Sequence, residues 1–175
     1  LRRAGYEVHC LAIANGCCGS SAYGREEPVS VRRAEAEEAC RLAGFTRHES
    51  LVDDLEVFYE RRTLARLAAL VRAVAPDILL THSPSDYMED HENTCRLAVS
   101  AAFGRGMRNL PTDPPTPAVS GPVPVYHAQP HGNRDPLGVA VRPTHFVYGG
   151  GDVLERKRAM LACHRSQAPW LHESQ

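Results

Sequence analysis

The 175-residue sequence predicts an α/β fold with a mostly parallel sheet. Residues 78–80 form an apolar block after Pro76, which is typical of a buried strand in a parallel sheet. A strongly periodic helical pattern over residues 60–74 precedes this block, and a second helical pattern through Leu97 and Ala102 follows it. Alternation of strand and helix along the chain predicts parallel strands joined by right-handed crossovers.

The first part of the chain predicts a strand, a helix and a second strand. Apolar and aromatic side chains recur over residues 6–14, which favours a strand, and the Asn-Gly pair at 15–16 predicts a sharp turn after it. Residues 28–42 predict a helix, with Gly44 suited to its C-terminal cap. The second strand is expected to end at residues 51–54.

The last part of the chain begins with a break in regular structure. Residues 104–121 are rich in proline and glycine, so a helix is excluded, and the segment is either a lid or substrate wall or a disordered loop. Residues 123–127 and 144–148 predict strands, and residues 153–164 predict a closing helix. The length favours one domain over residues 1–175.

Polar side chains gather where the strand at 78–80 ends and the next helix begins. In open α/β sheets this is the edge at which ligands bind. Two imidazoles and two carboxylates in this short stretch suit a metal such as zinc. The alternative is that Asp90 only caps the helix and His82 is only a polar strand end. The candidate residues are His82, Asp86, Asp90 and His91.

Two further histidines, His127 and His131, lie at and beyond the end of the strand over 123–127. If they share one side of an extended strand, both could reach a metal or a substrate. The alternative is that they are polar residues at a strand end.

Composition limits the classes of partner and location. The 20 Lys and Arg residues nearly balance the 21 Asp and Glu residues, so no nucleic-acid or anionic-membrane partner is indicated. No apolar run is long enough to span a bilayer. The six cysteines include no Cys-x-x-Cys pair, which argues against a thiolate zinc site, and they favour a reducing cytoplasm. A homo-oligomer stays open.

Three stretches together resemble the PIG-L/LmbE-like family of zinc-dependent N-deacetylases. The segment 81–91, Thr-His-Ser-Pro-Ser-Asp-Tyr-Met-Glu-Asp-His, resembles the family's second motif, in which the final histidine ligates zinc. Residues 32–35, Arg-Arg-x-Glu, resemble the start of a family helix whose arginine region faces the substrate. Residues 157–167 resemble the family's closing Lys-x-x-Ala and His-x-Ser-Gln pattern.

The resemblance implies a Rossmann-like, three-layer fold and a metal-dependent hydrolase. The expected reaction removes the acyl group from an N-acetylated amino sugar, such as an N-acetylglucosamine derivative, or from a similar small amide. On this resemblance His91 ligates Zn²⁺ and Asp90 is the catalytic neighbour that orients it. Arg32, Asp86 and Tyr87 are expected to line the substrate pocket.

The sequence departs from the family pattern at two places. The N-terminal His-Pro-Asp-Asp motif, which supplies the other two zinc ligands and the base, is absent. Met88 and Glu89 stand where many members carry His-Pro, although one subgroup reads Asp-Tyr-Met-x-Asp-His as here. The expectation is therefore a domain without its first strand, inactive by itself. The other alternative is a non-catalytic Rossmann-like module that binds a sugar or a nucleotide.

Overall fold

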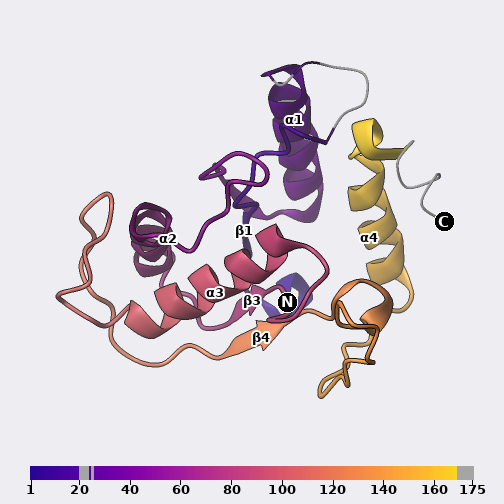
Figure 1. Ribbon diagram of the computed structural model, residues 1–175. Coiled ribbons are helices and arrows are strands. Elements are labelled where there is room, and N and C mark those ends of the chain that lie inside the picture. The colour runs from indigo at the N-terminus through magenta and orange to yellow at the C-terminus, as the bar shows by residue number, and fades with distance from the viewer. Residues whose placement is uncertain (20–23, 25, 169–175) are drawn as a thin grey trace. The chain divides into compact units, whose positions relative to one another are not determined.

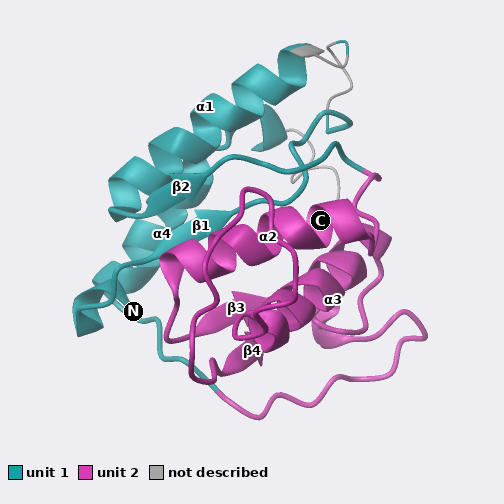
Figure 2. Cartoon of the chain, turned by 90° about the vertical axis from the view of Figure 1, so that its left-hand side faces the viewer, with its two compact units in different colours: residues 1–54, 146–175 teal, residues 55–145 magenta. Residues whose placement is uncertain are grey.

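The computed structural model describes residues 1–19, 24 and 26–168 of the chain (Figure 1). Within these residues it contains four α-helices and four short strands, and all strand pairing between named strands is parallel. The predicted α/β class with parallel pairing is therefore confirmed. The chain divides into two compact units, residues 1–54 with 146–175, and residues 55–145 (Figure 2). The single-domain organisation of residues 1–175 stays a prediction.

The first unit is built from the two ends of the chain. Strands β1 (His9–Leu11) and β2 (Thr46–His48) pair in parallel, and the isolated bridge between Ala14 and Val52 extends their pairing. Helix α1 (Glu26–Ala43) connects the two strands, and α4 (Asp152–Ala162) packs beside α1. The short 3-10 helices of this unit are η1 (Arg2–Ala4) and η3 (Arg165–Gln167).

The second unit repeats the same pattern of parallel strands and packed helices. Its helices α2 (Arg61–Val74) and α3 (Glu89–Gly104) pack against each other. Strands β3 (Leu79–Thr81) and β4 (Val125–His127) pair in parallel, and the 3-10 helix η2 (His131–Asn133) follows β4. The helix α3 buries the side chains of Leu97 and Ala101 completely. Full burial of a leucine side chain contributes about 1.5–3 kcal/mol to stability.

The prolines that interrupt helix formation after α3 sit in a loop that buried arginines hold in place. The guanidinium of Arg105 donates to the carbonyls of Pro76 at 2.8 Å and Gly121 at 3.0 Å. Arg72 donates to the carbonyl of Met107 at 2.6 Å and to that of Thr116 at 2.9 Å. Backbone oxygens that have no partner in a helix or sheet are satisfied in this way. The segment 104–121 is therefore an anchored loop, and the alternative of a disordered loop is wrong.

The predicted strand at 78–80 exists, but it is only half-buried. Strand β3 begins at Leu79 and ends at Thr81, and Thr81 is buried while Leu80 is 62% exposed. Adjacent side chains of a strand point to opposite faces, and in the described part of the chain only one face of β3 is covered. The expectation of a fully buried strand is therefore wrong.

Two other strand predictions need correction. The second strand ends at His48, because Val52 makes only an isolated bridge. Residues 144–148 form no strand, and Phe146, Val147 and Tyr148 are at least 85% exposed. An alternating or apolar pattern predicts a strand only where a partner strand is available, and in the described residues none pairs with this segment. No described helix is long and apolar enough to cross a membrane.

Candidate functional site

The loop between β3 and α3 is held by hydrogen bonds of its own side chains. Ser83 is buried and donates through its hydroxyl to the carbonyl of Ser85 at 2.8 Å. The backbone N–H of Asp86 donates to the carboxylate of Glu92 at 2.9 Å, and the N–H of Met88 donates to Asp86 Oδ1 at 3.2 Å. These contacts fix the loop before any ligand binds.

Two histidines and one aspartate meet at this loop. The rings of His82 and His91 are stacked with centroids 4.2 Å apart and an interplanar angle of 7°. Nδ1 of His91 lies 3.0 Å from Oδ1 of Asp86, whose carboxylate is buried. A carboxylate on one ring nitrogen fixes the tautomer and the orientation of the imidazole. We call His82, Asp86 and His91 the strand-end cluster.

The strand-end cluster favours an uncharged His82. Burial lowers the pKa of His82 below its ordinary value, and the nearby His91 lowers it further, while Asp86 opposes both effects. A neutral imidazole is the form that binds a metal ion.

The donor set fits a divalent metal ion. One ligand atom from each member of the cluster lies within 4.8 Å of the other two. Tetrahedral zinc with ligands at about 2.0–2.2 Å requires ligand atoms roughly 3.5 Å apart, a separation that lies within this limit. Two imidazoles and one carboxylate are a common set for catalytic zinc. His82, Asp86 and His91 could therefore hold a metal ion.

Tyr87 lies at the open side of the cluster. Tyr87 is 66% exposed, and its ring makes edge contacts with the rings of His91 and His131, with centroids 5.8 Å and 6.0 Å away. The structure thus brings together the predicted residues Asp86, Tyr87 and His91. An exposed aromatic ring beside an imidazole pair could contact a bound small molecule, so the substrate role of Tyr87 stays a prediction.

Asp90 does not make the contacts expected of it. The N-cap of α3 is Met88, and Asp90 lies inside the first turn, so the alternative that Asp90 caps the helix is wrong. Its buried carboxylate accepts the backbone N–H of Leu55 at 2.8 Å. The carboxylate that contacts the His91 ring belongs to Asp86. Asp86 lies just before the helix, and its side chain lies against the first turn, which carries His91. The catalytic role of Asp90 remains a prediction.

The two later histidines are not equivalent. Nδ1 of His127 donates to the carbonyl of His82 at 2.9 Å, so His127 supports the cluster through the backbone. His131 belongs to η2, where the chain has left the strand, so the expected sharing of one strand face is wrong. Its described ring contact is with Tyr87.

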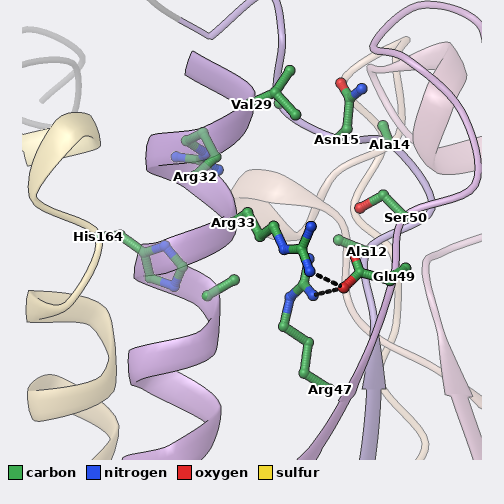
Figure 3. Close-up of a pocket in the computed structure, with 12 residues that line it drawn as sticks. Ala12, Ala14, Asn15, Val29, Arg32, Arg33, Arg47, Glu49, Ser50 and His164 are labelled. Atoms are coloured by element: carbon green, nitrogen blue, oxygen red, sulfur yellow. Dashed lines mark hydrogen bonds and ion pairs between the residues drawn. The ribbon is translucent and has the colours of Figure 1, made fainter. Parts of the chain in front are cut away.

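The structure places Arg32 in the first unit, where it lines a pocket (Figure 3). The pocket lies beside α1 and includes Asn15 and Gly16 after β1, Ser50 after β2, and His164 after α4. Gly16 has a φ of +83°, and a β-carbon there would lie 3.0 Å from Cγ of Arg32. Glycine at position 16 therefore suits both the positive φ of the turn and the close approach of the arginine side chain.

Glu35 belongs to the family-like helix start, but the sequence alone indicates no role for it. Its buried carboxylate accepts the N–H of Ser166 at 2.7 Å and the hydroxyl of Ser166 at 2.8 Å. Two stretches that resemble the family, 32–35 and 157–167, therefore meet within the first unit. Both stretches carry a family-like pattern in the sequence, but their contact joins residues 131 positions apart and is not predictable from either pattern.

A second group of potential metal ligands also lies in the first unit. One ligand atom each of Cys17, Cys18 and Asp54 lies within 4.8 Å of the others. The Asp54 carboxylate already accepts the backbone N–H groups of Gly16 at 2.7 Å and Cys18 at 2.9 Å. This carboxylate is thus used to hold the loop. The described residues contain no disulfide.

Comparison with known proteins shows the family. The model of the family described as PIG-L, GlcNAc-PI de-N-acetylase, matches residues 1–102. This chain belongs to the PIG-L family. A 4-oxalmesaconate hydratase from Pseudomonas putida is 30% identical over 174 residues, which cover 93% of this chain and 64% of the hydratase.

Solved structures agree with this assignment. An N,N'-diacetylchitobiose deacetylase from Pyrococcus horikoshii has a TM-score of 0.77 and 25% identity, covering 95% of this chain and 62% of that one. A 4-carboxy-2-hydroxymuconate hydratase from Pseudomonas putida has a TM-score of 0.74 and 26% identity, with 98% and 70% covered. The chain thus has the LmbE-like fold. The chain spans less than two thirds of the length of the 4-oxalmesaconate hydratase and of the deacetylase.

Proposed function

We propose that this protein is a zinc-dependent hydrolase that removes the acyl group from an N-acetylated amino sugar or a similar small amide. The observation that supports this most is the strand-end cluster, because it places His82, Asp86 and His91 together at the end of β3 in a member of the PIG-L family. Similarity to a chitobiose deacetylase of the same fold supports the choice of an acylated sugar.

In this proposal His91 holds the ion with His82 and Asp86 beside it. A zinc ion held by these residues would supply Lewis-acid chemistry for an amide carbonyl and for a water. Asp86 holds the His91 ring in one orientation through their 3.0 Å contact. Asp86 and Tyr87 are proposed to contact the substrate. Arg32 is proposed as a further substrate-binding residue, because it belongs to the stretch 32–35 that resembles the family. Asp90 is proposed as the catalytic carboxylate, one residue from His91.

A hydratase is the second candidate. The relative named 4-oxalmesaconate hydratase is 30% identical over 174 residues, which supports water addition to 4-oxalmesaconate or a similar compound as the alternative reaction. Both reactions bring water to an electrophilic carbon, so the same cluster could serve either one. The substrate, and not the metal, distinguishes the two candidates.

The location and assembly are also proposals. A cytoplasmic location is supported by six cysteines without a disulfide in the described residues. The proposed partner is a small-molecule substrate, and self-association into a homo-oligomer is a further proposal.

The test combines metal content with activity in the full-length protein. His91→Ala is expected to abolish stoichiometric zinc, measured by atomic emission, and to abolish hydrolysis of N,N'-diacetylchitobiose. His145→Ala is the matched control, because His145 is an exposed histidine of the same unit that contacts Tyr126. Unchanged zinc content in His91→Ala would contradict the metal site. Zinc-dependent water addition to an unsaturated acid, without amide hydrolysis, would favour the hydratase.

A further inference from the structure

The turn after β1 brings two thiols and a carboxylate together in the first unit. Sγ of Cys17 lies 3.8 Å from Sγ of Cys18. One donor atom of each cysteine and one carboxylate oxygen of Asp54 lie within 4.8 Å of one another. We call Cys17, Cys18 and Asp54 the thiol cluster. It differs from the strand-end cluster of the other unit, which contains no sulfur.

The separation of the two sulfurs suits coordination of one ion. The two cysteines are not joined in a disulfide. At a metal–sulfur distance of about 2.3 Å, the value for zinc thiolates, sulfurs 3.8 Å apart subtend an angle of roughly 110° at the ion. This is the tetrahedral angle, so both sulfurs can reach one ion at their present separation.

The carboxylate of Asp54 can bind an ion while it also holds the turn. Its Oδ1 accepts the backbone N–H of Gly16 at 2.7 Å, and its Oδ2 accepts that of Cys18 at 2.9 Å. A carboxylate offers about four lone-pair sites on its two oxygens, so about two of them remain for a bond to an ion. Hydrogen bonds to a ligating carboxylate also fix its orientation, as is usual around metal ions.

The backbone of the turn holds the cysteines before an ion binds. The N–H of Cys17 donates to Oδ1 of Asn15 at 3.1 Å, and the N–H of Gly19 donates to the carbonyl of Gly16 at 3.2 Å. Cys17 is only 4% exposed, whereas Cys18 is exposed. An ion can therefore enter from the side of Cys18 and is shielded from water on the side of Cys17.

We propose that the thiol cluster binds a soft cation of the class of Cu⁺ and Cd²⁺. Two of its three donors are sulfur, and thiolates select soft ions, whereas the imidazoles and carboxylate of the strand-end cluster suit a harder ion. Each thiol releases its proton to solvent as it binds the ion, so two protons leave for each cation bound. Three protein ligands leave a further position open to water.

The sequence alone does not indicate this site, because the cysteines are adjacent and lack the spacing of the usual thiolate motifs. The third donor, Asp54, lies 36 positions after Cys18 and comes beside it only in the folded chain. The inference goes beyond the proposed function, since occupancy of the thiol cluster requires no turnover. Its failure would leave the strand-end cluster and its chemistry untouched.

The test is titration of the chelator-treated full-length protein with Cd²⁺ in the presence of a phosphine reductant, which keeps the thiols reduced. Cadmium–thiolate bonds give a charge-transfer band in the ultraviolet, and cadmium on imidazole or carboxylate does not. The strand-end cluster is therefore silent in this measurement. The band is expected to saturate at one Cd²⁺ per chain, and His91→Ala is expected to give the same titration.

Substitutions within the thiol cluster should weaken the binding of Cd²⁺. Cys18→Ser is expected to lower the band and the affinity by more than the roughly 10–100-fold caused by losing an outer-shell partner, because it removes a ligand. Cys17→Ser should do the same, with circular dichroism to confirm that this buried change leaves the fold intact. Asp54→Asn keeps both sulfurs, so the band should remain while the affinity falls. Cys10→Ser is the control, because Cys10 is an exposed cysteine of the same unit.

Four results would overturn the inference. The wild type could give no saturable band. A full band in both Cys17→Ser and Cys18→Ser, lost in Cys10→Ser, would place the cation at Cys10. Unchanged affinity in Asp54→Asn would remove the carboxylate from the site. Loss of the band in His91→Ala would show that the cation depends on the strand-end cluster.

Discussion

At the scale of single residues, Asp86 and Asp90 show how backbone position decides the role of a side chain. Asp86 lies in the loop before α3, and its carboxylate contacts the His91 ring in the first turn of the helix. Asp90 lies one turn later and accepts the N–H of Leu55. The two carboxylates are chemically the same, but one contacts a potential metal ligand and the other holds a neighbouring segment.

This difference predicts separate effects of two matched substitutions. Asp86→Asn is expected to weaken zinc binding by about 10–100-fold, because a carboxylate partner raises the basicity of a ligating imidazole. Asp90→Asn keeps an oxygen for the Leu55 N–H, so the fold and the zinc affinity should stay near wild type. If Asp90 is catalytic, turnover should fall without loss of zinc. Competition with a zinc-binding dye measures the affinities, and equal losses in both variants would contradict the assignment.

At the scale of elements, the strongest sequence patterns were the most accurate. The helix predicted at 60–74 is α2 at Arg61–Val74, since periodic apolar side chains and Pro76 set its face and its end. The helices predicted at 28–42 and 153–164 are also confirmed, as α1 and α4. These elements are determined by neighbours in sequence.

Elements that depend on distant partners were predicted less well. The exposed segment around Val147 has an apolar pattern but no partner strand in the described part of the chain. The loop after α3 is ordered by Arg105, whose partners lie up to 29 positions away. Likewise, the candidate site at His91 was predictable from its motif, whereas the contact between Glu35 and Ser166 was not. Only the folded chain shows such pairings.

The C-terminal end of α2 offers a test of local backbone strain. Ala75 caps the helix with a φ of +49° and a ψ of 54°, a left-handed conformation that glycine adopts without steric penalty. Ala75→Gly is expected to stabilise the protein by about 1 kcal/mol, because the left-handed conformation costs a non-glycine residue roughly 1–2 kcal/mol.

The matched control makes the same substitution two residues earlier. Ala73 is an exposed residue inside α2, where glycine is unfavourable, so Ala73→Gly should destabilise by about 1 kcal/mol. Denaturant unfolding of both variants measures the two free energies. Destabilisation by Ala75→Gly would mean that the cap does not have this conformation in solution.

At the scale of the whole molecule, each compact unit has its own set of groups that could bind a ligand. The strand-end cluster lies entirely in residues 55–145, and the pocket with Arg32 and His164 lies entirely in the other unit. The first unit consists of two separate stretches of the chain, residues 1–54 and 146–175. The hydrogen bond between Ser166 and Glu35 fastens η3 to α1 within it. A ligand of one unit should thus act first on the stability of that unit.

Hydrogen exchange of the full-length protein should therefore show which unit binds zinc. A ligand at 100 times its Kd stabilises the state that binds it by about 2.7 kcal/mol, which slows exchange through local opening by up to about 100-fold. Zinc is expected to protect the amides of β3 and the start of α3, and His91→Ala should remove this protection. Arg32→Gln, a change in the other unit, should leave the zinc effect unchanged. Protection of α1 and η3 by zinc, kept in His91→Ala, would place the ion in the first unit and would contradict the assignment of the metal to the strand-end cluster.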